Sequence, residues 1–505
     1  MILIKGAKIV DGSGQTIPFL ADLLIKNDRI SAIGKFPSKK ADLVIDGLGL
    51  YITPGFIDVN THSDHHLSLF THPAQSDFLL QGVTTTFGGV CGASLAPLIA
   101  GGLEAIRKWT DTAQININWH SVGELLKILE TQKLGVNFGT LVGHSTIRRA
   151  MIGEDSRDLN ASEMNQFKKL VDDSMKEGAF GFSTGLGYSH THNTPFAEIK
   201  ELVRVIAKHG GVYATHLRND REGLTASVEE TVKVAEETGA KVVISHLKPL
   251  IGFENDYKKA IELIHQAADI HFDLFPTGES VVPIYTLLPA WARVGNLEIM
   301  LSYVRNPETR KRLIDDFSSI RGNEIRISQS IGRDYLVGKT LEEFAANQDL
   351  PLPEALVKLM ELTGLRSLII YKNINLDLAT HALGRERALI GSGSASLAEA
   401  AVLRYKTFKP KRFYDTFPTF LQTAIQRKLF SLAQAIQKIT SVPAKKYGLK
   451  DRGLVMENKI ADLNLISLKS GAVKIEHVLV NGKLAVKDGQ LQPVLAGRVL
   501  RHASA

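Results

Sequence analysis

The 505-residue sequence predicts an α/β protein in which a parallel (β/α)8 barrel of the TIM type carries a small β-sandwich domain. Two observations support this fold class. Short apolar segments of strand length alternate with helix-period segments through the middle of the chain, which is typical of a parallel barrel. Both ends of the chain contain only short apolar strands separated by turn residues. We therefore expect residues 53–451 to form the barrel, and residues 1–52 and 452–505 to form the small domain together.

The two ends of the chain predict antiparallel sheet. Near the N-terminus, short apolar runs alternate with glycine-containing turns such as Asp11-Gly12. Near the C-terminus, Asn481-Gly482 between two apolar runs is a strong signal for a β-hairpin. The strands expected near the N-terminus are Met1–Lys5, Lys8–Val10, Ala21–Lys26, Ile30–Ile33 and Leu43–Asp46.

Eight apolar segments of the middle region are predicted as barrel strands, with helices between them. These segments are Gly55–Val59, Val83–Phe87, Gly139–Gly143, Phe180–Ser183, Val212–His216, Val242–His246, Ile270–Leu274 and Ala388–Ser392. Leu368–Tyr371 competes for a place among them. Residues 281–348 are long for a connection between a strand and a helix, so we expect an insertion that covers the barrel mouth.

The composition argues against several classes of protein. A net charge of +7 is too small to indicate a nucleic-acid partner. Five of the nine residues from Arg404 to Arg412 are basic, and a solvated loop is favoured there over a nucleic-acid surface. No apolar run approaches about 18 residues, and no basic segment followed by a continuous apolar one opens the chain, so we expect neither membrane span nor signal peptide. The single Cys excludes an intrachain disulfide and indicates a reducing, cytoplasmic compartment.

Metal-competent side chains follow several of the predicted strands. His216 and His246 end two successive strands, Cys91 follows the strand at Val83–Phe87, and His62 follows the first strand. The carboxyl ends of parallel barrel strands meet at one face, so these side chains are expected to converge. One such His alone is more often a hydrogen-bonded core residue, but the set as a whole favours a metal site. A thiolate with imidazoles suits Zn²⁺ and leaves a fourth position for water.

Two segments carry a resemblance to a known family. The segment PGFIDVNTH at residues 54–62 resembles the opening motif of the amidohydrolase superfamily, and QGVTTTFGGVCGASLAP at residues 81–97 resembles the N-acyl-D-amino-acid deacylases, or D-aminoacylases. This resemblance covers nearly the whole chain. It implies a zinc-dependent enzyme that hydrolyses a linear amide C–N bond. It also implies that Cys91, His216 and His246 form the tight metal site.

The sequence departs from the resembled family at two positions. Asn60 stands where the family has the first His of its HxH pair, and Gly393 stands where it has the Asp that transfers protons. Glycine cannot transfer a proton, so the catalytic acid–base residue is unknown from the sequence. Asp64 and Asp273 are the candidate stand-ins, although each is more readily explained as a structural or solvated residue.

Further candidates concern the substrate. The segments THLRND and SHLK contain Arg218 and Lys248, cations suited to a substrate carboxylate. Ser183 ends a predicted strand and either lines the pocket or caps the following loop. Phe275 and Thr277 replace two tyrosines of the resembled family, which indicates an altered pocket. We therefore expect the substrate to be a small molecule with a carboxylate, such as an N-acyl amino acid. We expect neither a nucleic acid nor a membrane as a partner.

Two functions remain open at this stage. The first is a zinc-dependent amidohydrolase, and the second is a catalytically impaired metal-binding homologue that acts as a ligand-binding protein. The retained Cys and His residues favour the first, whereas Asn60 and Gly393 favour the second. The sequence leaves the substrate, its chirality and the oligomeric state undetermined.

Overall fold

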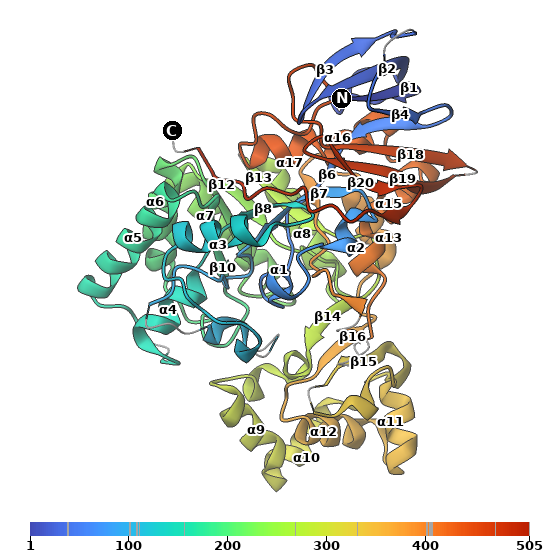
Figure 1. Cartoon of the computed structure of the whole chain (residues 1–505). Helices are drawn as coiled ribbons and strands as arrows, with labels where there is room; N and C mark the ends of the chain where they lie inside the picture. The colour runs from blue at the N-terminus through green and yellow to red at the C-terminus, as the bar shows by residue number, and fades with distance from the viewer. Residues whose placement is uncertain are drawn as a thin grey trace.

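The computed structural model describes the chain except for residues 38–39, 100–102, 108–109, 111, 156, 268, 331, 400–401, 403–407, 470 and 504–505. Figure 1 shows a central barrel with a β domain at one end of the molecule and a mostly helical lobe at the other. Among the described residues, no helix combines the length and apolarity that a bilayer span requires.

The barrel contains eight parallel strands when β8 and β9, which are separated by Leu141 alone, are counted as one. Two hydrogen-bonded sheets, β6-β7-β8 and β9-β10-β11-β12-β13-β17, follow the chain order. A parallel bridge between Thr61 and Ser394 brings the first and last strands together and closes the ring. The barrel strands are β6 (Phe56–Asp58), β7 (Val83–Gly88), β8 (Asn137–Thr140), β9 (Val142–Gly143), β10 (Gly181–Gly185), β11 (Val212–His216), β12 (Lys241–Ile244), β13 (Ile270–Leu274) and β17 (Ala388–Ile390).

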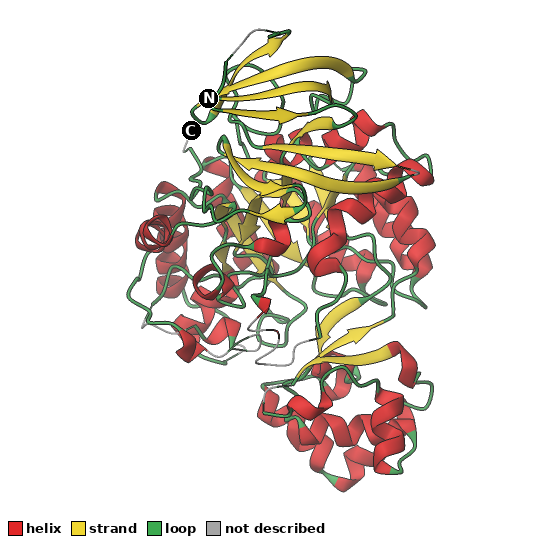
Figure 2. Ribbon diagram, turned by 45° about the vertical axis from the view of Figure 1, so that its right-hand side comes forward, coloured by secondary structure: helices red, strands yellow, loops and turns green. Residues whose placement is uncertain are grey.

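Helices surround these strands, as Figure 2 shows. Their ends follow local sequence signals: α5 begins with a capping box between Asn160 and Glu163, and α7 ends at Gly239, which has φ +67°. The helices around the barrel are α1 (Ser68–Thr71), α2 (Ser76–Leu79), α3 (Val122–Gln132), α4 (His144–Ile152), α5 (Ala161–Lys176), α6 (Phe196–Lys208), α7 (Leu224–Thr238), α8 (Glu254–Gln266), α13 (Leu376–Leu383), α15 (Arg412–Gln426), α16 (Leu432–Lys438) and α17 (Ser441–Lys446).

Strands from both ends of the chain form the β domain. Hydrogen bonds join them into one nine-stranded sheet, which forks at β1 because β4 and β5 both pair with it. The contact between the two ends is the antiparallel pair β5–β18. The strands are β1 (Ile2–Ile9), β2 (Phe19–Lys26), β3 (Arg29–Gly34), β4 (Leu43–Asp46), β5 (Tyr51–Pro54), β18 (Leu463–Lys469), β19 (Ala472–Val480), β20 (Lys483–Lys487) and β21 (Gln490–Leu491). The fold class predicted from the sequence, a barrel with a small β domain, is confirmed.

The insertion over the barrel mouth is longer than residues 281–348. It starts with β14 and ends with β16, because these two strands pair antiparallel with each other and therefore return the chain to the barrel. Leu368–Tyr371 is thus a strand of the insertion and not of the barrel. The helices and strands of the insertion are β14 (Ser280–Pro283), α9 (Leu297–Arg305), α10 (Pro307–Asp316), β15 (Ile325–Gln329), α11 (Leu341–Gln348), α12 (Leu352–Leu362) and β16 (Leu368–Tyr371). The insertion has a hydrophobic core of its own.

The last part of the chain returns to the barrel after β21. Phe138 of β8 donates a backbone hydrogen bond to the Arg498 carbonyl and accepts one from Leu500. Residues 497–502 therefore line the N-terminal end of the barrel, so the segment 452–505 is divided between the β domain and the barrel.

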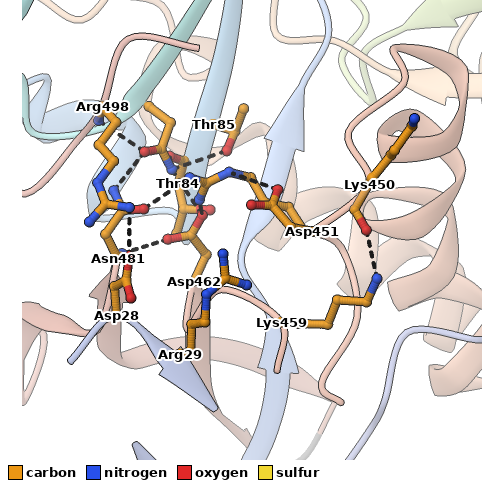
Figure 3. A network of polar contacts seen from close by, with 12 residues as sticks. Asp28, Arg29, Thr84, Thr85, Lys450, Asp451, Lys459, Asp462, Asn481 and Arg498 are labelled. Carbon is orange, nitrogen blue, oxygen red and sulfur yellow. Dashed lines mark hydrogen bonds and ion pairs between the residues drawn. The ribbon is translucent and has the colours of Figure 1, made fainter. Parts of the chain in front are cut away.

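A buried polar network joins these parts at the base of the barrel (Figure 3). The carboxylate of Asp462 accepts hydrogen bonds from the Asn137 side chain at 2.9 Å and from the Asn481 backbone at 2.6 Å, and it pairs with Arg452. Asn481 also donates to the Asn137 side-chain oxygen at 2.7 Å, and that oxygen accepts from the Arg498 backbone. We call these five residues the base network. They connect β8, the β19–β20 hairpin and the C-terminal segment.

Candidate metal-dependent active site

Three of the predicted metal ligands converge at the mouth of the barrel. Cys91, His216 and His246 each offer one ligand atom, and these atoms lie within 4.8 Å of one another. The Cys91 Sγ lies 3.4 Å from the His246 Nε2, and the two imidazole rings lie nearly perpendicular with centroids 4.5 Å apart. Burial lowers the pKa of His246 well below its usual value, which keeps the imidazole neutral as metal binding requires. No second group of three such ligands occurs in the described part of the chain.

This arrangement fits a zinc ion. Tetrahedral zinc binds sulfur at about 2.3 Å and nitrogen at about 2.0–2.1 Å, so its ligand atoms are separated by less than about 4 Å. The three atoms need only a small movement to reach that geometry. One thiolate and two imidazoles are also the donors that zinc prefers over oxygen-seeking cations.

His62 lies beside this group without joining it. Its Nε2 is 4.0 Å from the Cys91 Sγ, and its ring stacks on that of His65 with centroids 4.8 Å apart. The group of three ligands that lie within 4.8 Å of one another does not include it. His62 as a metal ligand therefore stays a prediction, and its position suits contact with a group bound at the site.

A cavity opens from the metal ligands toward the insertion, and its charged lining is mainly basic. His62, Cys91, His216 and His246 form its floor, and β14 and the following residues of the insertion form part of its wall. The charged residues that line it are Arg218, Asp220, Arg221, Lys248, Arg293 and Arg412. The Lys248 ammonium counteracts the effect of burial on Asp220 and lowers the pKa of that carboxyl.

Arg412 is the most buried of these cations. Only 7% of it is exposed, its Nη2 donates to the Gly393 carbonyl at 3.0 Å, and its guanidinium lies 4.6 Å from the Phe275 ring centroid. Its Nε has no hydrogen-bond partner within the described chain. Burial lowers the pKa of Arg412 to about 10, so it remains charged at neutral pH. A buried cation with a vacant donor is suited to an anionic ligand.

The expectation of a solvated loop at Arg404–Arg412 is therefore wrong for its last residue. Residues 404–407 lie outside the described part of the chain. Lys409 pairs with the Asp77 carboxylate at 2.5 Å, and Arg412 begins α15 with its side chain in the cavity. The sequence offered one weak signal, a cation at the start of an amphipathic helix, and surface helices share that pattern.

Gly393 lies at the edge of the cavity, next to Arg412. A Cβ built on it would have the Arg412 Nη1 as its nearest neighbour, at 3.6 Å, so a Cβ fits there in ordinary van der Waals contact. Its φ of +54° favours glycine, although Asp and Asn adopt this conformation more readily than other residues. The site thus has no carboxylate at the position where the resembled family carries its Asp.

Asp273, one of the two candidates to replace the missing proton-transfer Asp, is enclosed below the cavity. Its Oδ1 accepts from the His246 backbone at 3.0 Å, and Asn60 donates its amide to both Asp273 oxygens at 3.2 Å. Asp58 accepts at Oδ1 from the Asn60 and Ser392 backbones. Burial raises the pKa of each carboxyl to about 7. Neither lines the cavity, so both orient the residues above them.

Asp64, Ser183 and Arg218 all have hydrogen-bond partners within the protein. Asp64 accepts from the Gly89 backbone at 2.6 Å, and Ser183 hydrogen-bonds to Gly89 and Gly92, which flank Cys91. Arg218 reaches the cavity, but Glu230 and two backbone carbonyls occupy its guanidinium. Of the cations expected to bind substrate, Lys248 remains suited to that role.

Known proteins are similar to this chain in sequence and fold. No family model matches the chain. The D-aminoacylase of Alcaligenes xylosoxydans xylosoxydans is 28% identical, over 100% of this chain and 98% of that protein. A solved D-aminoacylase structure, described as defining a novel subset of amidohydrolases, has a TM-score of 0.81 at 28% identity and covers 99% of each chain. A solved N-acyl-D-glutamate deacylase from Bordetella bronchiseptica, complexed with zinc and a phosphonate inhibitor, shares the fold with a TM-score of 0.80 at 24% identity, over 99% of each chain.

A parallel barrel with one Cys and two His side chains that converge at its mouth, and a β domain built from both chain ends, places the protein in the class of the amidohydrolases. Within this class, the chain is similar over its whole length to the D-aminoacylases, in agreement with the resemblance of its PGFID and QGVTT segments.

Proposed function

We propose that the protein is a zinc-dependent amidohydrolase that hydrolyses the amide C–N bond of an N-acyl amino acid or a similar small carboxylate. The observation that carries this proposal is the convergence of Cys91, His216 and His246 at the floor of a basic cavity. Relatives named as deacylases of N-acyl-D-amino acids support the same class of substrate.

Cys91, His216 and His246 would hold the zinc ion. When bound there, zinc polarises an amide carbonyl and lowers the pKa of a water molecule. The chain contributes the position of these ligands, a cavity that limits access of bulk water, and cations around the place of the substrate.

The basic lining supports a substrate that carries a carboxylate. Lys248 follows β12 in the chain and Arg412 begins α15, and both line the cavity. Burial lowers the pKa of both cations, because each lacks a full solvent shell. An anionic group would restore the lost solvation, and a guanidinium binds a carboxylate in a planar, directed geometry.

A specific observation supports a second candidate function. Gly393 provides no proton-transfer group, and Asp64 and Asp273 are hydrogen-bonded outside the cavity. Protonation of the leaving amine is then unassisted by a carboxylate at these positions. The second candidate is therefore a catalytically impaired homologue that binds zinc and a small carboxylate as a ligand-binding protein.

One experiment separates the two functions. The zinc-loaded protein is screened for turnover of N-acetyl- and N-formyl-amino acids of both chiralities, and binding of the same compounds is measured by calorimetry. Turnover that disappears in Cys91→Ser supports the amidohydrolase, whereas binding without turnover supports the ligand-binding protein. Absence of both would contradict the proposal.

The carboxylate contact has its own test. Lys248→Met and Arg412→Met are each expected to weaken binding about tenfold or more, because each removes a charged partner of the ligand. Lys233→Met is the matched control, since that lysine lies on the surface of α7. Equal affinity in all three variants would contradict the carboxylate assignment.

A further inference from the structure

Cys91 is held in a tight turn with an unusual backbone conformation. The turn consists of Gly89–Gly92, which we call the Cys91 turn, and it follows β7. Cys91 has φ +52°, a left-handed conformation that is sterically unfavourable for a non-glycine residue. Such a conformation persists only where the surroundings enforce it. The groups that enforce it therefore also decide where the thiolate points.

The Ser183 hydroxyl is inserted into this turn. It donates to the Gly89 carbonyl at 2.5 Å and accepts from the Gly92 N–H at 3.0 Å. In a closed β-turn, the first carbonyl would accept directly from the N–H three residues later. Here the hydroxyl lies between these two groups and holds the turn open. Ser183 is completely buried, so bulk water does not compete for either bond.

Asp64 holds the same turn from another direction. Its Oδ2 accepts from the Gly89 N–H at 2.6 Å. Gly89 is thus fixed at its carbonyl by Ser183 and at its N–H by Asp64. The carbonyl of Gly92 accepts from the Ser145 backbone at 2.7 Å, which fixes the far end of the turn.

The position of Ser183 connects the Cys91 turn to another metal ligand. Ser183 belongs to β10, and β10 pairs with β11 so that Gly185 lies opposite His216. The Ser183 hydroxyl therefore connects the Cys91 turn to β10. This strand is the neighbour of β11, which carries His216. The distance between the Cys91 Sγ and the His216 imidazole therefore depends on the contact of Ser183 with the Cys91 turn.

We infer that Ser183 is a positioning residue of the metal site, whose hydroxyl sets the place of the Cys91 thiolate, with Asp64 as its second support. This inference rests on the proposed zinc site. Without the hydroxyl, the Gly89 carbonyl and Gly92 N–H lose their partner in a buried place, and the turn closes on itself to pair them. Closure moves Cys91 away from its place opposite His246.

Zinc and cobalt binding test this inference. Ser183→Ala is compared with the natural protein by transfer of zinc to a chromogenic chelator and by the thiolate-to-cobalt charge-transfer band of the Co²⁺ form. We expect zinc affinity to fall about 10- to 100-fold and the band to weaken, as for other residues that orient a metal ligand. Thr184→Val is the matched control, because Thr184 is its buried neighbour in β10 and hydrogen-bonds to Tyr213 and Thr215 instead. Its zinc affinity should stay within about threefold of the natural protein.

Unchanged zinc affinity and an unchanged cobalt band in Ser183→Ala would overturn the inference. If Ser183→Ala does not fold, Asp64→Ala replaces it, because Asp64 holds the same Gly89: a weakened band in the folded variant supports the inference, and an unchanged band contradicts it. The Cys91→Ser variant distinguishes an error in the proposed zinc site from an error in the role of Ser183. Zinc bound equally tightly by Cys91→Ser would contradict the proposed site, whereas loss of zinc there with full retention in Ser183→Ala would contradict only the role of Ser183.

Discussion

The two ends of the barrel treat buried polar groups differently. At the base, the side chains of Asn137, Asp462 and Asn481 all have hydrogen-bond partners at every nitrogen and oxygen. Beside that network, the Thr84 Oγ1 and the Asn464 Oδ1 lack a partner within the described chain. At the mouth, four buried carboxyl, amide or guanidinium side chains each have one atom without a partner within the described chain. These atoms are the Oδ2 of Asp58, the Oδ1 of Asn60, the Oδ1 of Asp64 and the Nε of Arg412.

This difference assigns separate tasks to the two ends. A buried polar group without a partner costs about 1–3 kcal/mol, so its retention requires another explanation, such as a ligand. The satisfied base network joins the β domain and the C-terminal segment to the barrel. At the mouth, the Arg412 Nε is the one of these four atoms whose residue lines the cavity beside the proposed zinc site. We expect stability to depend mainly on the base and binding mainly on the mouth.

The largest effect is expected for the metal ligands. His216→Ala and His246→Ala should each reduce tightly bound zinc from about one ion per chain to almost none, because two remaining ligands cannot hold it against a chelator. Metal analysis after dialysis measures this. His72→Ala is the control and should retain zinc. It removes an imidazole that lies outside the site and is hydrogen-bonded to Ser76. His62→Ala should also retain most of the zinc, and full loss there would place His62 among the ligands.

Gly393→Asp tests the missing proton-transfer group at the mouth. General acid–base help contributes on the order of 10²–10⁴ in rate, or about 3–5 kcal/mol, so this variant should raise amide turnover. The gain will be below that range if the new carboxylate pairs with Arg412, whose Nη1 is 3.6 Å from the Cβ position. Gly393→Asn introduces a side chain of the same shape that has no titratable carboxyl group, so it should not raise amide turnover. Equal rates in the three proteins would mean that another residue transfers the proton.

Asp462→Ala tests the base of the barrel. It removes the buried carboxylate that pairs with Arg452, a residue that is 6% exposed, and leaves only the more distant Asp451 carboxylate at 3.9 Å. Removal of one member of a buried ion pair costs about 3–5 kcal/mol, so the midpoint of denaturant unfolding should fall strongly. Zinc affinity of the remaining folded protein should be unchanged. A large loss of zinc affinity with little loss of stability would contradict the separation of tasks between the two ends.

The smallest effect concerns the pH dependence of stability. Burial raises the pKa of Asp58 in the folded protein to about 7, against about 3.9 when unfolded, so the folded state binds the extra proton between these values. This contribution is fully present below about pH 4 and is lost as the pH rises to about 7, by at most about 1.4 kcal/mol per pH unit. Asp58→Asn should flatten the profile measured by denaturant unfolding from pH 5 to 8. Parallel profiles for the two proteins would contradict the assignment.

Local pattern was enough to predict much of the molecule. The apolar runs before His216 and His246, and the glycines around Cys91, indicated ligands at the mouth of a parallel barrel. Asn481-Gly482 indicated the hairpin between β19 and β20, and the positive φ of both residues agrees with it. These features depend on periodicity and turn chemistry within a few residues, which the sequence shows directly.

Contacts between distant segments were decided only by the tertiary structure. Nothing local to Asn481 indicates that its side chain contacts Asn137, 344 positions away, or that the Asn60 amide encloses Asp273, 213 positions away. Arg412 lies in a basic run that resembles a surface loop, and its burial follows from the packing of α15 against α2, α16 and β19. Ser183 acts on the Cys91 turn because barrel closure sets β10 beside it. The chemistry of each side chain is fixed by the sequence, but its partner depends on strand register and chain closure, which no single segment contains.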